Sequence, residues 1–172
     1  MTPATDNLRR LLRPVENPYV VVRQPVEHAI WEALIARDSQ AFAAADWSIC
    51  EQDFAANRFE GISANGSFDP MRWTLRYPTL TSYRDDWLRM AAGFKVLPLS
   101  DVAHASLLYK MQRIAKIEVV GDRAVVWKQF HADEMLSTGG RYSIRSQSLY
   151  RMHHIEGRWL IVGFVGYLPL EP

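Results

Sequence analysis

The sequence predicts an α+β protein in which helices cover one face of an antiparallel sheet. Between residues 26 and 56, small and apolar side chains recur at steps of three and four, the spacing of one face of an amphipathic helix. Between 112 and 167, runs that alternate polar and apolar residues are separated by short turn sequences, as in consecutive antiparallel strands. Because an apolar sheet face must be covered, we expect the amino-terminal helices to pack on it.

The amino-terminal helical region is expected to lead into a short strand. Leu34 and Phe42 lie on the apolar face of the first helix. Asp46 is suited to accept hydrogen bonds from free backbone N–H groups, so it predicts a second, short helix over 47–56. Residues 58–62 then alternate polar and apolar side chains, which favours a strand.

A connection over 63–82, rich in glycine, proline and aromatic residues, is expected to contain one short strand around 72–76. We expect Thr81 to cap a following helix over 82–92. Three large side chains share one face of that helix, at spacings of four and three: Tyr83, Trp87 and Met90. Two interpretations stay open, because such a stripe either packs in the core or lines a pocket.

From His104 onward the sequence predicts mostly strands. Turn sequences occur at Gly121-Asp122, at 137–140 and at Glu156-Gly157. Each turn joins two alternating runs, which is the signal of a β-hairpin. The expected strands cover 112–120, 123–134, 141–153 and 158–167.

Composition indicates one globular domain over 26–172. The 172 residues are 48% hydrophobic and 12% aromatic, which is enough for a full core. Lysine and arginine number 20 against 19 acidic residues, so no basic field predicts a nucleic-acid partner. The sequence has no run of eighteen apolar residues, so we expect no membrane span.

Residues 1–25 are expected to form an amino-terminal arm that packs on the body or on a second subunit, with a short edge strand over 19–22. Membrane attachment of this arm is the less favoured alternative, because its amphipathic part is too short.

Cys50 is the one cysteine and has no internal disulfide partner. Together with the lack of a signal sequence, this predicts a cytoplasmic protein in which Cys50 is a small buried residue.

Several short stretches of sequence occur in an order that resembles one protein superfamily. They are Ala41-Phe42, Asp46-Trp47, Asp53-Phe54-Ala55, Phe59-Glu60-Gly61, 117–126, 147–150 and 157–159. The order is similar to the SnoaL-like branch of the nuclear transport factor 2 (NTF2) superfamily, which includes ketosteroid isomerase, scytalone dehydratase and limonene epoxide hydrolase. The resemblance, over residues 30–168, implies a cystatin-like cone: a strongly bent antiparallel sheet with about three helices packed on its concave face, around an apolar pocket.

The catalytic residues of these relatives do not carry over to this sequence. The resemblance places the catalytic aspartate of ketosteroid isomerase near Ile62, and the Tyr-Asp pair of scytalone dehydratase on Phe42 and Ala43. The Asp-Arg-Asp set of limonene epoxide hydrolase has no counterpart that we can place. The resemblance therefore implies a pocket that, if active, uses residues of its own.

Candidate pocket residues follow from the alternation of side chains along a strand. The face of 141–153 that carries Arg145 and Arg151 favours solvent, so the opposite face is expected to line the pocket. This predicts six lining residues on two neighbouring strands: Trp127, Gln129, His131, Ser146, Ser148 and Tyr150. A slip of one residue would invert the assignment for a strand.

His131 is the first candidate for acid and base chemistry. Asp133 lies two residues along the same strand face and is placed to orient the imidazole, whose ordinary pKa of about 6.5 suits proton transfer near neutrality. The alternative is an exposed polar residue. Glu60 is the second candidate, because an apolar pocket raises the pKa of a carboxyl group. Its alternative is an ion pair with Arg58 or another surface cation.

The sequence gives no support to metal or cofactor chemistry. His153 and His154 are consecutive in an expected strand and so point to opposite faces, and no phosphate-binding loop or serine-nucleophile motif is present. We therefore expect no metal and no cofactor.

Two classes of function remain. One is a cofactor-free lyase, isomerase or cyclase, dehydratase-like, acting on a small hydrophobic molecule by proton transfer; the other is a non-catalytic ligand-binding or protein-assembly module.

We also expect a homodimer formed through the outer face of the sheet. The residues expected there are Arg145, Gln147, Leu149 and Arg151, beside the apolar Leu160, Val162 and Phe164. A monomer would leave this mixed surface partly apolar and exposed to water.

Overall fold

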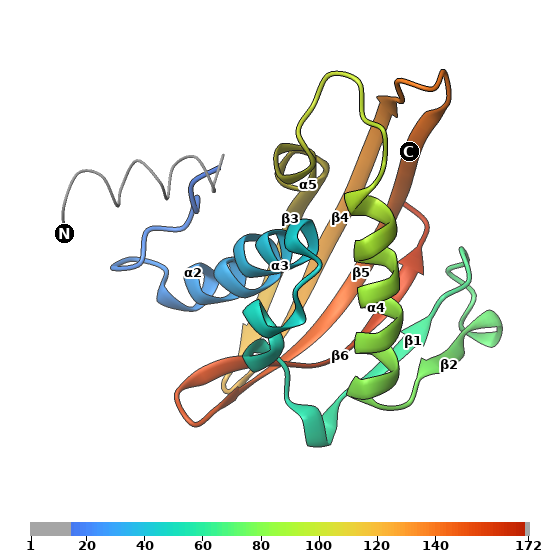
Figure 1. Cartoon of the computed structure of the whole chain (residues 1–172). Coiled ribbons are helices and arrows are strands. Elements are labelled where there is room, and N and C mark those ends of the chain that lie inside the picture. The colour runs from blue at the N-terminus through green and yellow to red at the C-terminus, as the bar shows by residue number, and fades with distance from the viewer. Residues whose placement is uncertain (1–14, 171–172) are drawn as a thin grey trace.

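The computed structural model describes residues 15–170, which form a six-stranded, strongly bent sheet with helices on its concave side (Figure 1). The strand order is β2-β1-β6-β5-β4-β3. The strands are β1 (Glu60–Ser63), β2 (Thr74–Tyr77), β3 (Gln112–Val120), β4 (Arg123–Met135), β5 (Arg141–Ile155) and β6 (Arg158–Leu168). The predicted α+β class and cone are confirmed.

The carboxyl-terminal strands agree with their predicted bounds to within two residues. The three turns predicted between them connect β3 to β4, β4 to β5 and β5 to β6, and all three pairs are antiparallel. The sheet is not wholly antiparallel, however, because β1 pairs in parallel with β6. Partners so distant along the chain leave no local turn signal, so the sequence pattern did not predict this pair.

The first helical region is continuous from Pro25 to Ala44. It consists of α2 (Pro25–Trp31), a π-helical segment (Glu32–Arg37) and α3 (Asp38–Ala44). Ala45, with a φ of 54°, adopts the left-handed conformation that ends many helices. As predicted, the Asp46 carboxylate accepts a hydrogen bond from the next helical turn, from Ser48 N at 3.0 Å.

The predicted short helix over 47–56 is instead a series of 3₁₀ turns, at Trp47–Ile49, Glu51–Asp53 and Ala56–Arg58. Buried Asp53 accepts two hydrogen bonds from Arg37, at 2.7 and 2.8 Å, which tie these turns to the first helical region.

Helix α4 (Leu80–Lys95) begins two residues earlier and ends three residues later than predicted. Its cap is Thr79 rather than Thr81: Thr79 Oγ1 accepts from Ser82 N at 3.2 Å, and the Ser82 hydroxyl bonds back to Thr79. This reciprocal arrangement is a capping box built with serine in place of the usual Glu or Gln.

Helix α5 (His104–Met111) corrects the prediction of strand from His104 onward. Its buried residues Leu107, Leu108 and Met111 follow helical spacing, but so short an apolar run does not distinguish a helix from a buried strand.

A second correction concerns residues 19–22. They form a turn in which Arg23 N and Gln24 N both donate to the Val20 carbonyl, and no edge strand is present there.

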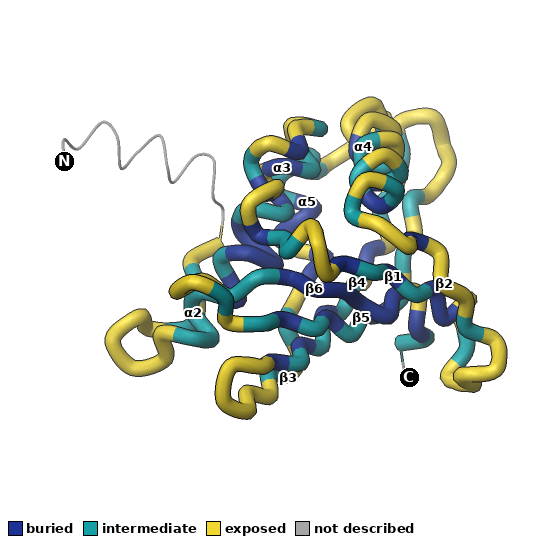
Figure 2. Tube along the Cα trace, turned by 90° about the horizontal axis from the view of Figure 1, so that it is seen from below, coloured by how far each residue is buried: buried dark blue, intermediate teal, exposed yellow. Residues whose placement is uncertain are grey.

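Helices α3, α4 and α5 lie together on one side of the sheet, and the buried part of the chain runs between the two layers (Figure 2). The core there includes a cluster of aromatic rings from helices, turns and strands: Trp47, Phe54, Phe59, Tyr83, Trp87 and Phe164. Cys50 is buried, as predicted. Within residues 15–170, no helix is long and apolar enough to cross a membrane.

The predicted amino-terminal arm lies mostly outside the described residues, which begin at 15. Of the arm, the structure describes the turn at 19–22 and the entry into α2 at Pro25. Asn17 is bound there to the His28 carbonyl at 3.0 Å and to Glu32 Oε1 at 2.9 Å, so this end of the arm packs on the body.

Candidate functional site

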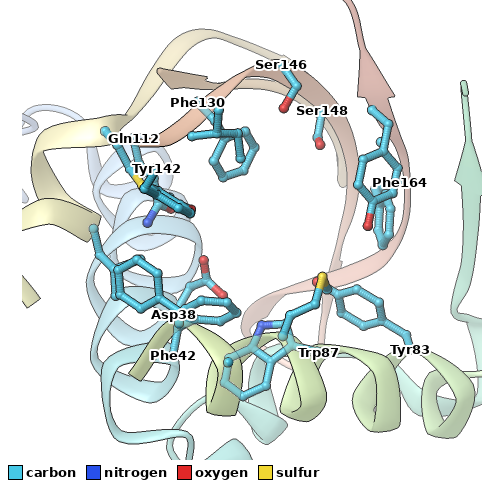
Figure 3. A pocket seen from close by; sticks show the side chains of 18 of the residues that line it. Asp38, Phe42, Tyr83, Trp87, Gln112, Phe130, Tyr142, Ser146, Ser148 and Phe164 are labelled. Atoms are coloured by element: carbon cyan, nitrogen blue, oxygen red, sulfur yellow. The ribbon is translucent and has the colours of Figure 1, made fainter. Parts of the chain in front are cut away.

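A cavity of about 560 Å³ lies between the concave face of the sheet and helices α3, α4 and α5 (Figure 3). This volume is typical of a site for a small organic ligand. Aromatic and aliphatic side chains form most of the wall: Phe42, Tyr83, Trp87, Met90, Phe94, Leu97, Leu108, Met111, Phe130, Tyr142, Ile144, Tyr150, Phe164 and Tyr167. The polar lining side chains beside these tyrosines are Asp38, Gln112, Ser146 and Ser148.

Asp38 is the one charged residue among the described residues that line the cavity. It is the first residue of α3, and its side chain projects from that helix toward the cavity (Figure 3). Its Oδ2 accepts a hydrogen bond from Lys128 Nζ at 2.7 Å. Its Oδ1 has no hydrogen-bond partner in residues 15–170, and the side chain keeps 26% of its surface accessible. Asp38 therefore offers one carboxylate oxygen to whatever enters the cavity.

Lys128 is fully buried, with no accessible side-chain surface, in the middle of β4. A buried ammonium group needs hydrogen-bond partners, because it has lost its water. Beside Asp38, Lys128 Nζ donates to the Leu34 carbonyl at 2.5 Å. It also lies 5.1 Å from the ring centre of Phe130 and 5.9 Å from that of Tyr150, distances at which a cation is attracted to an aromatic face.

The π-helical segment Glu32–Arg37 provides the Leu34 carbonyl for this contact. In a regular α-helix the Asp38 N–H would donate to the Leu34 carbonyl four residues back. Here it donates to the Ile35 carbonyl, and the Leu34 carbonyl accepts from Lys128. π-Helical turns are rare and occur often at functional sites. This one links the helix and strand that carry Asp38 and Lys128.

Hydroxyl groups line the cavity both on the sheet, from β5, and on helix α4. Ser146 and Ser148 project into it from β5 (Figure 3). Burial raises the pKa of Tyr83 and of Tyr150, so both phenols stay protonated and keep an O–H donor. The site thus combines one carboxylate acceptor with several hydroxyl donors.

Gln112, at the start of β3, is the other polar residue of the wall. Its amide Nε2 donates to Ser39 Oγ at 3.2 Å. Its Oε1 is buried without a hydrogen-bond partner among the described residues. Buried oxygens of this kind are uncommon and need an explanation, such as a water or a ligand group.

Six of the predicted ligand-binding residues line the cavity: Tyr83, Trp87, Met90, Ser146, Ser148 and Tyr150. For Trp87 the two interpretations left open are both correct. Its side chain is 3% exposed and packs edge-on against Phe42 and Trp47, and it also forms cavity wall. That these residues bind a ligand stays a prediction.

The assignment for β4 was wrong by one residue. Phe130 pairs with Ser146 and Lys128 pairs with Ser148, so Lys128 and Phe130 share the concave face with the serines. Trp127 and Gln129 lie on the outer face, where Gln129 is hydrogen-bonded to Arg113 at 2.7 Å. The physical reason is the burial of Lys128, because a lysine on a strand face normally indicates that the face is exposed to solvent.

The three predicted catalytic residues lie outside the cavity lining. His131 and Asp133 are exposed. Asp133 is hydrogen-bonded to Arg141, at 2.7 Å, and this bond lowers the pKa of Asp133. Asp133 therefore pairs with an arginine rather than orienting His131. Glu60 forms its alternative, an ion pair, with Arg151 at 2.9 Å.

Sequence reasoning missed Asp38, although a signal was present. Leu34, Asp38 and Phe42 follow one another at spacings of four, so a carboxylate occupies the apolar face of the first helical region.

A second correction concerns Phe164. It was expected on the outer face, but it lines the cavity, where it packs against Tyr83 and Tyr150.

The bent sheet, the three helices and the cavity between them define an NTF2-like fold. An NTF2-like protein with a cystatin-like fold from Novosphingobium aromaticivorans aligns with a TM-score of 0.53 at 16% identity, over 99% of this chain and 92% of that one. An NTF2-like protein of unknown function from Shewanella baltica aligns with a TM-score of 0.50 at 19% identity, over 86% and 95%.

A domain of unknown function with a cystatin-like fold from Nostoc punctiforme aligns with a TM-score of 0.50 at 13% identity, over 99% of this chain and 81% of that one. No family model matches the sequence, and no curated protein does. At identities this low the likeness establishes the fold alone, so function must be argued from the site.

Proposed function

We propose that this protein is a cofactor-free lyase or isomerase that moves a proton on a small, mostly apolar molecule, with Asp38 as the proton-accepting group. The observation that carries the proposal is the single carboxylate oxygen, Asp38 Oδ1, left without a partner in a cavity otherwise lined by uncharged residues. Lys128 holds the Asp38 carboxylate in one orientation at the cavity wall, so a bound substrate meets the base already positioned.

The rest of the wall supplies what such a reaction needs. Loss of a carbon-bound proton leaves negative charge on the substrate, and hydroxyl donors aimed at the developing charge stabilise the transition state. Ser146, Ser148 and the protonated phenols of Tyr83 and Tyr150 are available for this. Lys128 keeps Asp38 in one orientation and stays behind the wall, so we give it no direct part in proton transfer.

The ring opening of 5-nitrobenzisoxazole tests the proposal without knowledge of the natural substrate. A base removes the C3 proton, the N–O bond breaks, and a coloured cyanophenolate forms. General-base catalysis contributes about 10²- to 10⁴-fold, so we expect Asp38→Asn to lower kcat/KM by about that factor. His131→Ala, which changes an exposed histidine outside the lining, serves as the matched control and should keep the parent rate.

A parent no faster than Asp38→Asn would refute the proposed chemistry. If the parent then still binds the compound, the second class of function predicted from the sequence applies, a ligand-binding module without catalysis. Asp38 is an acid–base group that Lys128 holds at 2.7 Å in the cavity wall, and this positioning favours the enzyme over the module.

A further inference from the structure

We infer that Lys128 sets the charge of the ligand: it makes the cavity select an uncharged molecule that carries a hydroxyl or N–H donor for Asp38 Oδ1. The inference rests on the proposed function, because it concerns the same cavity. It makes Lys128 a specificity-determining residue that acts through Asp38.

The charge balance of the cavity supports this selection. Asp38 is the one charged lining residue within 15–170, and the buried ammonium of Lys128, 2.7 Å away, offsets its charge. A ligand ammonium would lose its hydration and meet a carboxylate that is already paired. A ligand carboxylate would face the unpaired Oδ1 and be repelled. A hydroxyl group donates to Oδ1 without burying a net charge.

Lys128 is fixed in place and separated from the ligand space. The Leu34 carbonyl and Asp38 hold its ammonium group at 2.5 and 2.7 Å. The rings of Phe130 and Tyr150, which themselves line the cavity, lie on the ammonium group at 5.1 and 5.9 Å. Lys128 is not part of the lining. Its effect on a ligand must therefore pass through the charge and orientation of Asp38.

Three naphthalene probes of equal ring size test the inference by isothermal titration calorimetry at pH 7. They are 1-naphthalenemethanol, 1-naphthalenemethylamine as its ammonium ion, and 1-naphthoate. In the parent protein we expect the alcohol to bind at least about tenfold more tightly than either ion, because a charged group loses its hydration in the cavity. Lys128→Met should reverse the order of alcohol and ammonium. Asp38→Asn should raise the affinity for naphthoate.

Lys110→Met is the matched control, because Lys110 forms an exposed ion pair with Glu134 and lies outside the lining. Lys110→Met should bind the three probes in the same order of affinity as the parent. If Lys128→Met does not fold, two measurements still test the inference: the order of probe affinities in the parent, and the change in naphthoate affinity in Asp38→Asn. An unchanged order in Lys128→Met, or a parent that prefers either ion, would overturn the inference.

Failure of the inference and failure of the proposed function give different results. Loss of nitrobenzisoxazole turnover in Asp38→Asn, with the same probe order in every variant, refutes the role of Lys128 and keeps Asp38 as the base. A reversal of probe order without turnover in the parent supports the role of Lys128 and refutes the enzyme.

Discussion

Replacing Lys128 with methionine should destabilise the protein more than replacing any surface lysine. Breaking a buried ion pair by removal of one partner costs about 3–5 kcal/mol. Here the low end applies to the pair itself, since the Asp38 side chain keeps 26% of its surface and is open to water from the cavity. The Leu34 carbonyl also loses its lysine donor, and a buried acceptor left unsatisfied costs about 1–3 kcal/mol.

Together these losses predict a decrease of about 4–6 kcal/mol in the free energy of unfolding, a large part of the roughly 5–15 kcal/mol typical of a domain. Urea unfolding at pH 7, followed by tryptophan fluorescence, measures it. The Asp38→Asn, Lys128→Met double variant completes a cycle, in which the coupling free energy should be about 1–3 kcal/mol.

Lys110→Met provides the reference for a surface pair. Its partner is Glu134, and its own side chain is 65% exposed, so the expected loss is below about 1 kcal/mol. Our account of the buried pair fails if Lys128→Met costs no more than Lys110→Met, or if the cycle shows no coupling between Lys128 and Asp38.

Four further predictions concern other parts of the molecule. Trp87→Ala should cost about 3 kcal/mol in urea unfolding, the low end for a buried tryptophan because the space left opens into the cavity; a loss below about 1 kcal/mol would contradict its core role. The Tyr77 hydroxyl, 2.5 Å from Asp86 Oδ2, is the main cause that lowers the pKa of Asp86. A depressed carboxyl pKa stabilises the fold above the unfolded value of about 3.9 and loses that effect as pH falls through the folded value. Tyr77→Phe should therefore be less stable than the parent at pH 7 in thermal melts, and the difference should shrink toward pH 2; a constant difference would refute the linkage. We propose that the outer sheet face forms a homodimer, so Leu149→Asp, in its half-buried apolar cluster, should give a monomer by light scattering, whereas a monomeric parent would refute the dimer. His131→Ala should bind 1-naphthalenemethanol like the parent, and weakened binding would return His131 to the site.

The sequence predicted most of the architecture, because alternation and turn residues are local signals. The β3–β4 hairpin agrees with its predicted bounds to within one residue, since Gly121-Asp122 marks its turn without ambiguity. Helix α5 was missed because eight residues are too few for the helical period to stand out. The parallel β1–β6 pair was missed because nothing local specifies partners so far apart.

The candidate site was predicted in part. Tyr83, Trp87 and Met90 follow from helical spacing, and Ser146, Ser148 and Tyr150 from strand alternation. Asp38, the base that we propose, was not predicted, because it pairs with a buried lysine and lysines are usually exposed. A lysine on a strand predicts solvent, and only the paired carboxylate of Asp38, ninety residues away in sequence, makes its burial possible.

A crystal structure of the complex with 1-naphthalenemethanol would test the central claim most directly, that Asp38 faces a ligand in this cavity. We predict that the naphthalene ring lies between α4 and β5, with the ligand hydroxyl oxygen about 2.5–3.0 Å from Asp38 Oδ1. A ligand bound on the outer face near His131, or a cavity filled by its own side chains with no ligand inside, would contradict the claim.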